Sequence, residues 1–85
     1  MPKPIRLSGH ARLQLGFRGV TEEEVVDAIR SSDWQPAAQG RLECRRNFAF
    51  NRTWNNRYYV TKQVRPVFVD GPDEIVVVTV YAYYS

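Results

Sequence analysis

The chain has 85 residues, which is enough for one domain and too few for two. Its composition is 44% hydrophobic, 25% charged and 13% aromatic, which excludes a disordered chain and is typical of a globular protein. The formal net charge of +3 is too small to indicate a partner, so the placement of the charges matters more than their sum. We predict a single domain over residues 1–85.

Targeting and redox features predict a cytoplasmic location. Basic residues near the N-terminus are not followed by an apolar run, which argues against a signal peptide. The longest apolar stretch, Ile75 to Val78, is far too short to cross a bilayer. Cys44 is the only cysteine and His10 the only histidine, so neither an internal disulfide nor a zinc site is expected. No glycine-rich phosphate loop is present, and we expect no cofactor and no metal.

Two helices are predicted in the first third of the chain. Ser8 can cap a first helix that runs to about Phe17 and ends at Gly19. Thr21 and Glu24 have the spacing of a capping box at the start of a second helix. The apolar stripe that this second helix would bury comprises Val25, Val26 and Ile29.

From Arg41 onward the apolar residues alternate with polar ones, which predicts strands. Four are expected, over about residues 41–50, 57–61, 64–69 and 74–83. Arg46 interrupts the apolar face of the first strand, so it lies at an edge or reaches into a site. Pro66 predicts an edge position or a bulge for the third. The fold class is α+β, with two N-terminal helices packed on one face of a four-stranded antiparallel sheet, in the order ααββββ.

The charges are segregated along the chain. Basic residues occur without acids in residues 1–18 and 44–69, whereas acids gather mainly in residues 22–33 and 70–74. Such segregation can create a positive field that attracts polyanions; the alternative is that arginines decorate a solvated sheet face. Arg18 has a second interpretation as a structural clamp on the turn after the first helix. The candidate phosphate-binding residues are Arg12, Arg18, Arg45, Arg46, Arg57, Lys62 and Arg65.

Metal-independent RNA cleavage needs a base, an acid and cations that hold the charge growing on the phosphate. His10 lies just after the predicted N-cap, where the helix dipole disfavours the imidazolium and favours a neutral base. The alternative is a partly buried histidine that ties the first helix to the sheet. Without a second histidine, Tyr81 is the candidate acid. Tyr58 and Tyr83 are candidates for base stacking, and core or edge packing is the alternative for each tyrosine.

Four segments of the chain carry a family resemblance. His10-Ala11, Arg18-Gly19-Val20-Thr21 and Glu24-Val25 resemble the opening of the bacterial domain of unknown function family four-two-five-eight, and Val76 to Tyr81 is similar to its last strand. The resemblance covers about residues 6–84. It implies the fold of ribonuclease toxins of the barnase, EndoU, colicin and RelE type, in which the open face of a sheet can hold RNA. Members often carry a basic residue where this chain has Gln14, which implies a weakened or retuned activity if that residue binds phosphate or joins in catalysis.

Three hypotheses for the function follow from the sequence. The first is a metal-independent ribonuclease or ribosome-directed toxin that uses His10. The second is an RNA-binding module without turnover, such as a decayed toxin scaffold. The third is a protein-interaction domain in which the strand near Val67 or the apolar last strand pairs with an antitoxin-like partner or a second copy. We favour a toxin-like, RNA-directed domain, with no membrane surface as partner.

Overall fold

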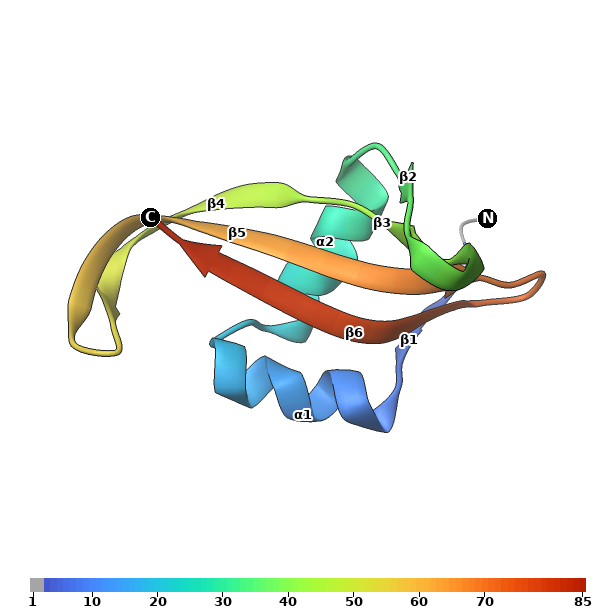
Figure 1. The fold of residues 1–85 in the computed structure, drawn as a ribbon, viewed down its shortest axis with the longest axis horizontal. Helices are drawn as coiled ribbons and strands as arrows, with labels where there is room; N and C mark the ends of the chain where they lie inside the picture. Colours follow the sequence, from blue (N-terminus) through green and yellow to red (C-terminus); the bar gives the residue numbers. More distant parts are fainter. Residues whose placement is uncertain (1–2) are drawn as a thin grey trace.

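A computed structural model gives the fold, and it describes residues 3–85 (Figure 1). The elements in chain order are β1 (Ile5–Leu7), α1 (Gly9–Arg18), α2 (Glu22–Ser31), β2 (Gln35–Pro36), the short 3-10 helix η1 (Ala38–Gly40), β3 (Leu42–Glu43), β4 (Arg46–Trp54), β5 (Arg57–Asp70) and β6 (Ile75–Tyr84). No helix within this described range is long and apolar enough to cross a membrane.

The strands form one six-stranded sheet in the order β1-β6-β5-β3-β2, with β4 also paired to β5. All pairs are antiparallel except β1 with β6, which is parallel. The predicted α+β class with two helices and a mostly antiparallel sheet is confirmed, but the prediction of four strands is wrong. β1 and β2 have only three and two residues, too short to show an alternating pattern. The strands predicted over 57–61 and 64–69 are one strand, β5.

Pro66 lies in the middle of β5, which is paired on both sides, so the predicted edge position is wrong. β3 and β4 hold one register against β5 on either side of Cys44, which falls opposite Pro66. The Cys44 N–H donates to the Pro66 carbonyl at 3.4 Å, and proline has no N–H to return a bond. This accounts for the break between β3 and β4, which the sequence predicts as one strand. On the other side of β5 the register against β6 shifts directly after Val67, as the predicted bulge requires.

The helix boundaries follow the predicted caps. The Ser8 hydroxyl accepts from the Ala11 N–H at 3.1 Å, and Thr21 and Glu24 bond reciprocally as a capping box. Gly19 ends α1 with φ of +68°, in the left-handed region. A Cβ at Gly19 would lie 2.7 Å from the Trp54 ring, so this turn requires glycine for its backbone and for its contact.

Both helices contribute to one core on the same side of the sheet. The buried cluster includes Ala11 of α1, Val25, Ala28 and Ile29 of α2, Val64 and Phe68 of β5, and Val77 and Val80 of β6. In Figure 1, α2 lies behind β5 and α1 lies along β6. We call this side, which bears Val64 and Phe68, the closed face. The opposite side, which bears Gln63 and Arg65, is the open face.

Candidate nucleic-acid interface

The open face presents rows of polar side chains across its strands. Residues directly opposite each other in antiparallel strands direct their side chains to the same face. Arg65 of β5 lies opposite Tyr81 of β6, and the shared register of β3 and β4 places Arg45 opposite Arg65. The next row along the strands comprises Asn47, Gln63 and Tyr83. Cationic, amide and phenolic groups therefore lie side by side on the face that the helices leave uncovered.

Tyr81 lies between two guanidinium groups. The Arg18 Cζ is 5.3 Å and the Arg65 Cζ 5.2 Å from the centroid of the Tyr81 ring, within the range of cation–π interactions. Arg65 also donates to the Glu43 carboxylate and, at 3.1 Å, to the Tyr83 hydroxyl. The Glu43 hydrogen bond, and to a lesser extent that of Tyr83, raises the pKa of Arg65 further above its ordinary value. We call Arg18, Arg65, Tyr81 and Tyr83 the arginine–tyrosine cluster.

Helix α1 borders the open face along the edge of β6. The Gln14 side-chain oxygen accepts from the Val80 N–H at 2.8 Å and from the Thr79 hydroxyl at 2.5 Å. His10 lies one turn before Gln14 and Arg18 one turn after it, so these three residues follow the edge of β6. At a rise of about 1.5 Å per residue, His10 and Arg18 are about 12 Å apart along the helix axis.

His10 is exposed, and it has no hydrogen bond or ion pair with any of residues 3–85. The interpretation of His10 as a partly buried tie between helix and sheet is therefore wrong. Arg18 has the aromatic contact described above, and its Nε is buried without a hydrogen-bond partner. Its backbone carbonyl accepts from the Tyr84 hydroxyl at 2.5 Å, so the turn after α1 is held by the backbone of Arg18 and not by its side chain.

Two of the predicted phosphate ligands lie on the closed face instead. Lys62 is only 2% exposed, and its Nζ donates to the Glu24 carboxylate at 2.8 Å and to the Gly19 carbonyl at 2.9 Å. The Arg46 Nε lies 3.3 Å from the Asp27 carboxylate without hydrogen-bond geometry. Both cations are occupied by contacts between α2 and the sheet, so neither is available to a phosphate on the open face.

The remaining predicted residues lie away from the cluster. Arg12 pairs with Glu22 at 2.8 Å, and both side chains are at least half exposed. Arg57 and Tyr58 begin β5 at the turn of the β4–β5 hairpin. They are about 26 Å and about 23 Å, respectively, along the strand from Arg65, at about 3.3 Å per residue. The structure thus groups Arg18, Arg45, Arg65, Tyr81 and Tyr83, and separates them from Arg12, Arg57 and Tyr58.

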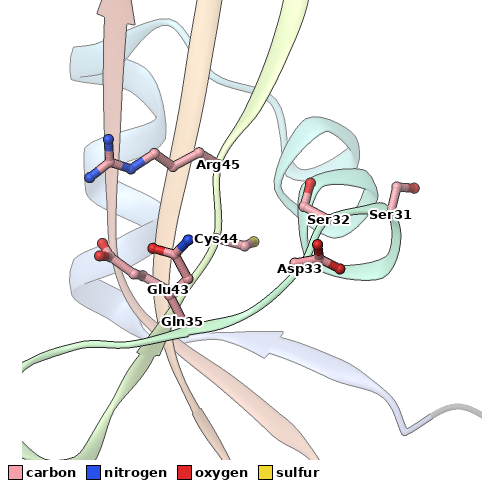
Figure 2. A pocket seen from close by; sticks show the side chains of 7 residues that line it. All are labelled: Ser31, Ser32, Asp33, Gln35, Glu43, Cys44 and Arg45. Atoms are coloured by element: carbon pink, nitrogen blue, oxygen red, sulfur yellow. The ribbon is translucent and has the colours of Figure 1, made fainter.

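A pocket that the sequence does not reveal lies at the edge of the sheet, where β3 gives way to β4 (Figure 2). Its volume is about 410 Å³, and its lining comprises Ser31, Ser32, Asp33, Gln35, Glu43, Cys44 and Arg45. The residues come from the end of α2, from β2 and from the β3–β4 link, so no local motif connects them. Arg45 belongs both to this pocket and to the row of Arg65 and Tyr81.

Cys44 is one of the residues that line this pocket, and its side chain points toward α2 (Figure 2). It is 2% exposed, and its Sγ donates to the Ala28 carbonyl at 3.3 Å. Burial, with a smaller effect of the Glu43 charge, raises the pKa of the Cys44 thiol to about 11. The thiol is thus held in its unreactive form. In residues 3–85 no three histidine, cysteine, aspartate or glutamate side chains are grouped to hold a metal ion.

The predicted pairing edges are partly occupied. Val67 belongs to the central strand β5, and the outer edge of β6 is occupied by β1 over residues 75–77 and by Gln14 at Val80. Among the described residues, the outer edge of β4 has no strand partner. Asn51 has φ of +50° and interrupts the register of β4, which limits how a further strand can pair there.

No family model matches the chain, and comparison with curated proteins and with solved structures found no match either. The resemblance to family four-two-five-eight stays a prediction.

Proposed function

We propose that this chain is an RNA-directed domain that binds single-stranded RNA across the open face of its sheet. The observation that carries the proposal is the Tyr81 ring between the guanidinium groups of Arg18 and Arg65. Guanidinium groups match the geometry of phosphate oxygens, and aromatic rings beside them stack on unpaired bases. Tyr83, 47% exposed and adjacent to Arg65, offers the second stacking surface.

The charges on the open face support this proposal. Of the three arginines there, Arg18, Arg45 and Arg65, only Arg65 forms an ion pair within residues 3–85, with Glu43. Arg45 is exposed and forms no ion pair within residues 3–85, so its guanidinium is free to meet a phosphate. The resemblance to family four-two-five-eight supports the same function, because it implies a sheet whose open face holds RNA.

Binding is tested by fluorescence anisotropy with a short labelled oligouridine, at salt concentrations from about 50 to about 200 mM. We expect Arg45→Gln to weaken binding and to reduce the magnitude of the salt slope by about one, because one phosphate contact is lost. Arg57→Gln makes the same charge change at the hairpin turn and is the matched control, with affinity within about twofold of the wild type. Absence of salt-dependent binding by the wild type would refute the proposal.

A second candidate function, metal-independent ribonuclease activity, is favoured by the position of His10. His10 is exposed, lacks a partner in the described chain and follows the same edge of β6 as Arg18. In this mechanism His10 takes the proton of the 2′-hydroxyl, whose oxygen attacks the phosphorus, the guanidinium groups hold the charge on the phosphate, and Tyr81 protonates the leaving 5′-oxygen. Because Tyr81 contacts Arg18, which lies about 12 Å from His10 along the axis of α1, the His10 side chain has to reach along the helix toward the phosphate. Gln14 stands between them with its oxygen committed to β6, so only its NH₂ group remains to meet the substrate.

The ribonuclease candidate is tested with end-labelled RNA in EDTA, comparing the wild type with His10→Ala. Cleavage by the wild type alone, leaving 2′,3′-cyclic phosphate ends, would establish the activity and the role of His10. Equal cleavage by both proteins would exclude His10 from the reaction. Binding without cleavage by either would leave the RNA-binding function and reject the ribonuclease.

A further inference from the structure

We propose that Glu43 is a positioning residue, which holds the guanidinium of Arg65 in place to bind an RNA phosphate. The inference rests on the proposed RNA binding. By its charge, Glu43 would be expected to oppose RNA, because a carboxylate repels a phosphate. Yet Glu43 is only 9% exposed, and its carboxylate accepts a hydrogen bond from Arg65. Figure 2 shows the Glu43 side chain projecting across the strands and away from α2.

The strand register brings Glu43 within reach of Arg65. Glu43 of β3 lies opposite Val67 of β5, and Arg65 is two residues from Val67 on the same face. Diagonal neighbours of this kind are about 7–8 Å apart, which long side chains can span. The residue directly opposite Arg65 is Arg45, and like charges in that arrangement repel each other. A carboxylate at position 43 offsets this repulsion.

The guanidinium of Arg65 is held from the strands on both sides of β5. Its Nε donates to Glu43 of β3, and its Nη1 donates to the Tyr83 hydroxyl of β6 at 3.1 Å. Its Cζ also lies 5.2 Å from the centroid of the Tyr81 ring. A guanidinium has five N–H donors, so these two bonds leave three, all on Nη1 and Nη2. Those two nitrogens together can meet two oxygens of one phosphate.

Fixing Arg65 before RNA arrives should increase affinity. An arginine that is free in solution loses rotamer freedom when it binds, and this loss lowers affinity by about twofold to about tenfold. Glu43 and Tyr83 impose the same order in the free protein, so binding no longer loses it. Glu43 therefore acts in two opposite ways, since its hydrogen bond orders Arg65 and its charge repels the phosphate. Substitutions can separate these two effects.

The test compares Glu43→Ala with Glu43→Gln, which remove the same charge, while only glutamine keeps an acceptor for the Arg65 Nε–H. Affinity for labelled oligouridine is measured by fluorescence anisotropy at about 100 mM salt, where exposed charges are screened beyond about 10 Å. We expect Glu43→Ala to bind about fivefold more weakly than Glu43→Gln, and Glu43→Gln to bind at least as tightly as the wild type. Glu23→Ala removes a charge from an exposed position on α2 and is the control, within about twofold of the wild type.

A second background separates positioning from a general effect on the fold. With Arg65→Gln there is no guanidinium to hold, so Glu43→Ala should no longer weaken binding. Urea denaturation of each variant checks that it is folded under the assay conditions. If Glu43→Ala does not fold, Tyr83→Phe serves instead, because it keeps the ring and removes only the other acceptor of Arg65. We expect Tyr83→Phe to weaken binding about twofold, and only where Arg65 is present.

The outcomes distinguish this inference from the proposed function. Equal affinity of Glu43→Ala and Glu43→Gln, both tighter than the wild type, would overturn the inference, because Glu43 would then act on RNA only through its charge. A weakening that persists with Arg65→Gln would also overturn it, because Glu43 would then act through another group. In both cases the RNA-binding function stands. Absence of salt-dependent binding by the wild type would overturn the proposed function and this inference together.

Discussion

The two faces of the sheet use their basic residues differently, although both draw them from the same strand. Lys62 and Arg65 are three residues apart in β5, yet Lys62 is buried against Glu24 and Arg65 lies on the open face between Glu43 and two tyrosines. On the closed face each cation meets a carboxylate of α2. On the open face, Arg65 pairs with Glu43, whereas Arg18 and Arg45 form no ion pair within residues 3–85.

This difference shows that basic residues in a strand indicate a nucleic-acid surface only when they share a face. Side chains alternate between the two faces along a strand, so residues three positions apart point to opposite faces. A run of arginines and lysines in one strand is therefore shared between the two faces. The closed face uses its cations to attach a helix, and its variants should change stability. The cations of the open face remain accessible to RNA. Substituting them should therefore weaken RNA binding with little effect on the stability of the fold.

The largest expected effect comes from breaking the buried pair on the closed face. Glu24→Ala leaves the Lys62 ammonium buried without its carboxylate and also removes half of the capping box of α2. We expect the free energy of unfolding to fall by about 3 kcal/mol, measured by urea denaturation. Glu23→Ala, its exposed neighbour in α2, should change it by less than about 0.5 kcal/mol. An equal effect of the two substitutions would contradict the role assigned to the pair.

A second prediction compares the reactivity of a thiol on the two faces at consecutive positions. Cys44 faces α2, and Arg45 faces the open side (Figure 2). The fold raises the pKa of the Cys44 thiol from 9.0 to about 11, so near pH 8 the native chain should react with iodoacetamide about 100-fold more slowly than the unfolded chain. The stabilisation from the neutral thiol is complete below about pH 9 and is lost as the pH rises through about 11. In a Cys44→Ala background, Arg45→Cys should react at nearly the unfolded rate. Fast alkylation of native Cys44 would show that the closed face opens readily.

The smallest expected change in stability comes from Gln14, which lies where α1 meets the outer edge of β6, between the two faces. Gln14→Leu removes the acceptor of the Val80 N–H and the Thr79 hydroxyl, and we expect a loss of about 1 kcal/mol in unfolding free energy. Hydrogen exchange of the Val80 amide should accelerate in the same variant. Gln14→Glu keeps an acceptor and should retain most of the stability, whereas Gln14→Lys, with no acceptor, should resemble Gln14→Leu. Loss of stability in Gln14→Glu as well would show that the side-chain oxygen is not the group that matters.

Local signals predicted the helical part of the fold well. Ser8, Thr21, Glu24 and Gly19 act through bonds to residues three or four positions away, and each does what its type and spacing predict. The strand pattern was harder to interpret, because Pro66 suggested an edge or a bulge and residues 51–56 fell between two predicted strands. In the structure, pairing on both sides carries β5 through the proline, and the hairpin turn is confined to Asn55 and Asn56.

The site was only partly predictable. Sequence reasoning named Arg18, Arg45, Arg65, Tyr81 and Tyr83, and the structure brings these together. It also named Lys62 and Arg46, because nothing in a single sequence says which face of a strand a helix will cover. The pocket that Asp33 lines was missed because it joins residues 31–35 to residues 43–45, and that meeting depends on how the chain packs after α2.

The sequence by itself determined the class of this protein, its helix termini and the types of side chain available to a polyanion. Those properties depend on composition and on contacts between residues a few positions apart, and the amino-acid sequence determines both directly. Only the tertiary structure decided that Arg18 meets Tyr81, that Gln14 covers the edge of β6 and that Lys62 is buried. Those contacts join residues more than 40 positions apart, and they arise from strand register and helix packing, which depend on the whole core at once.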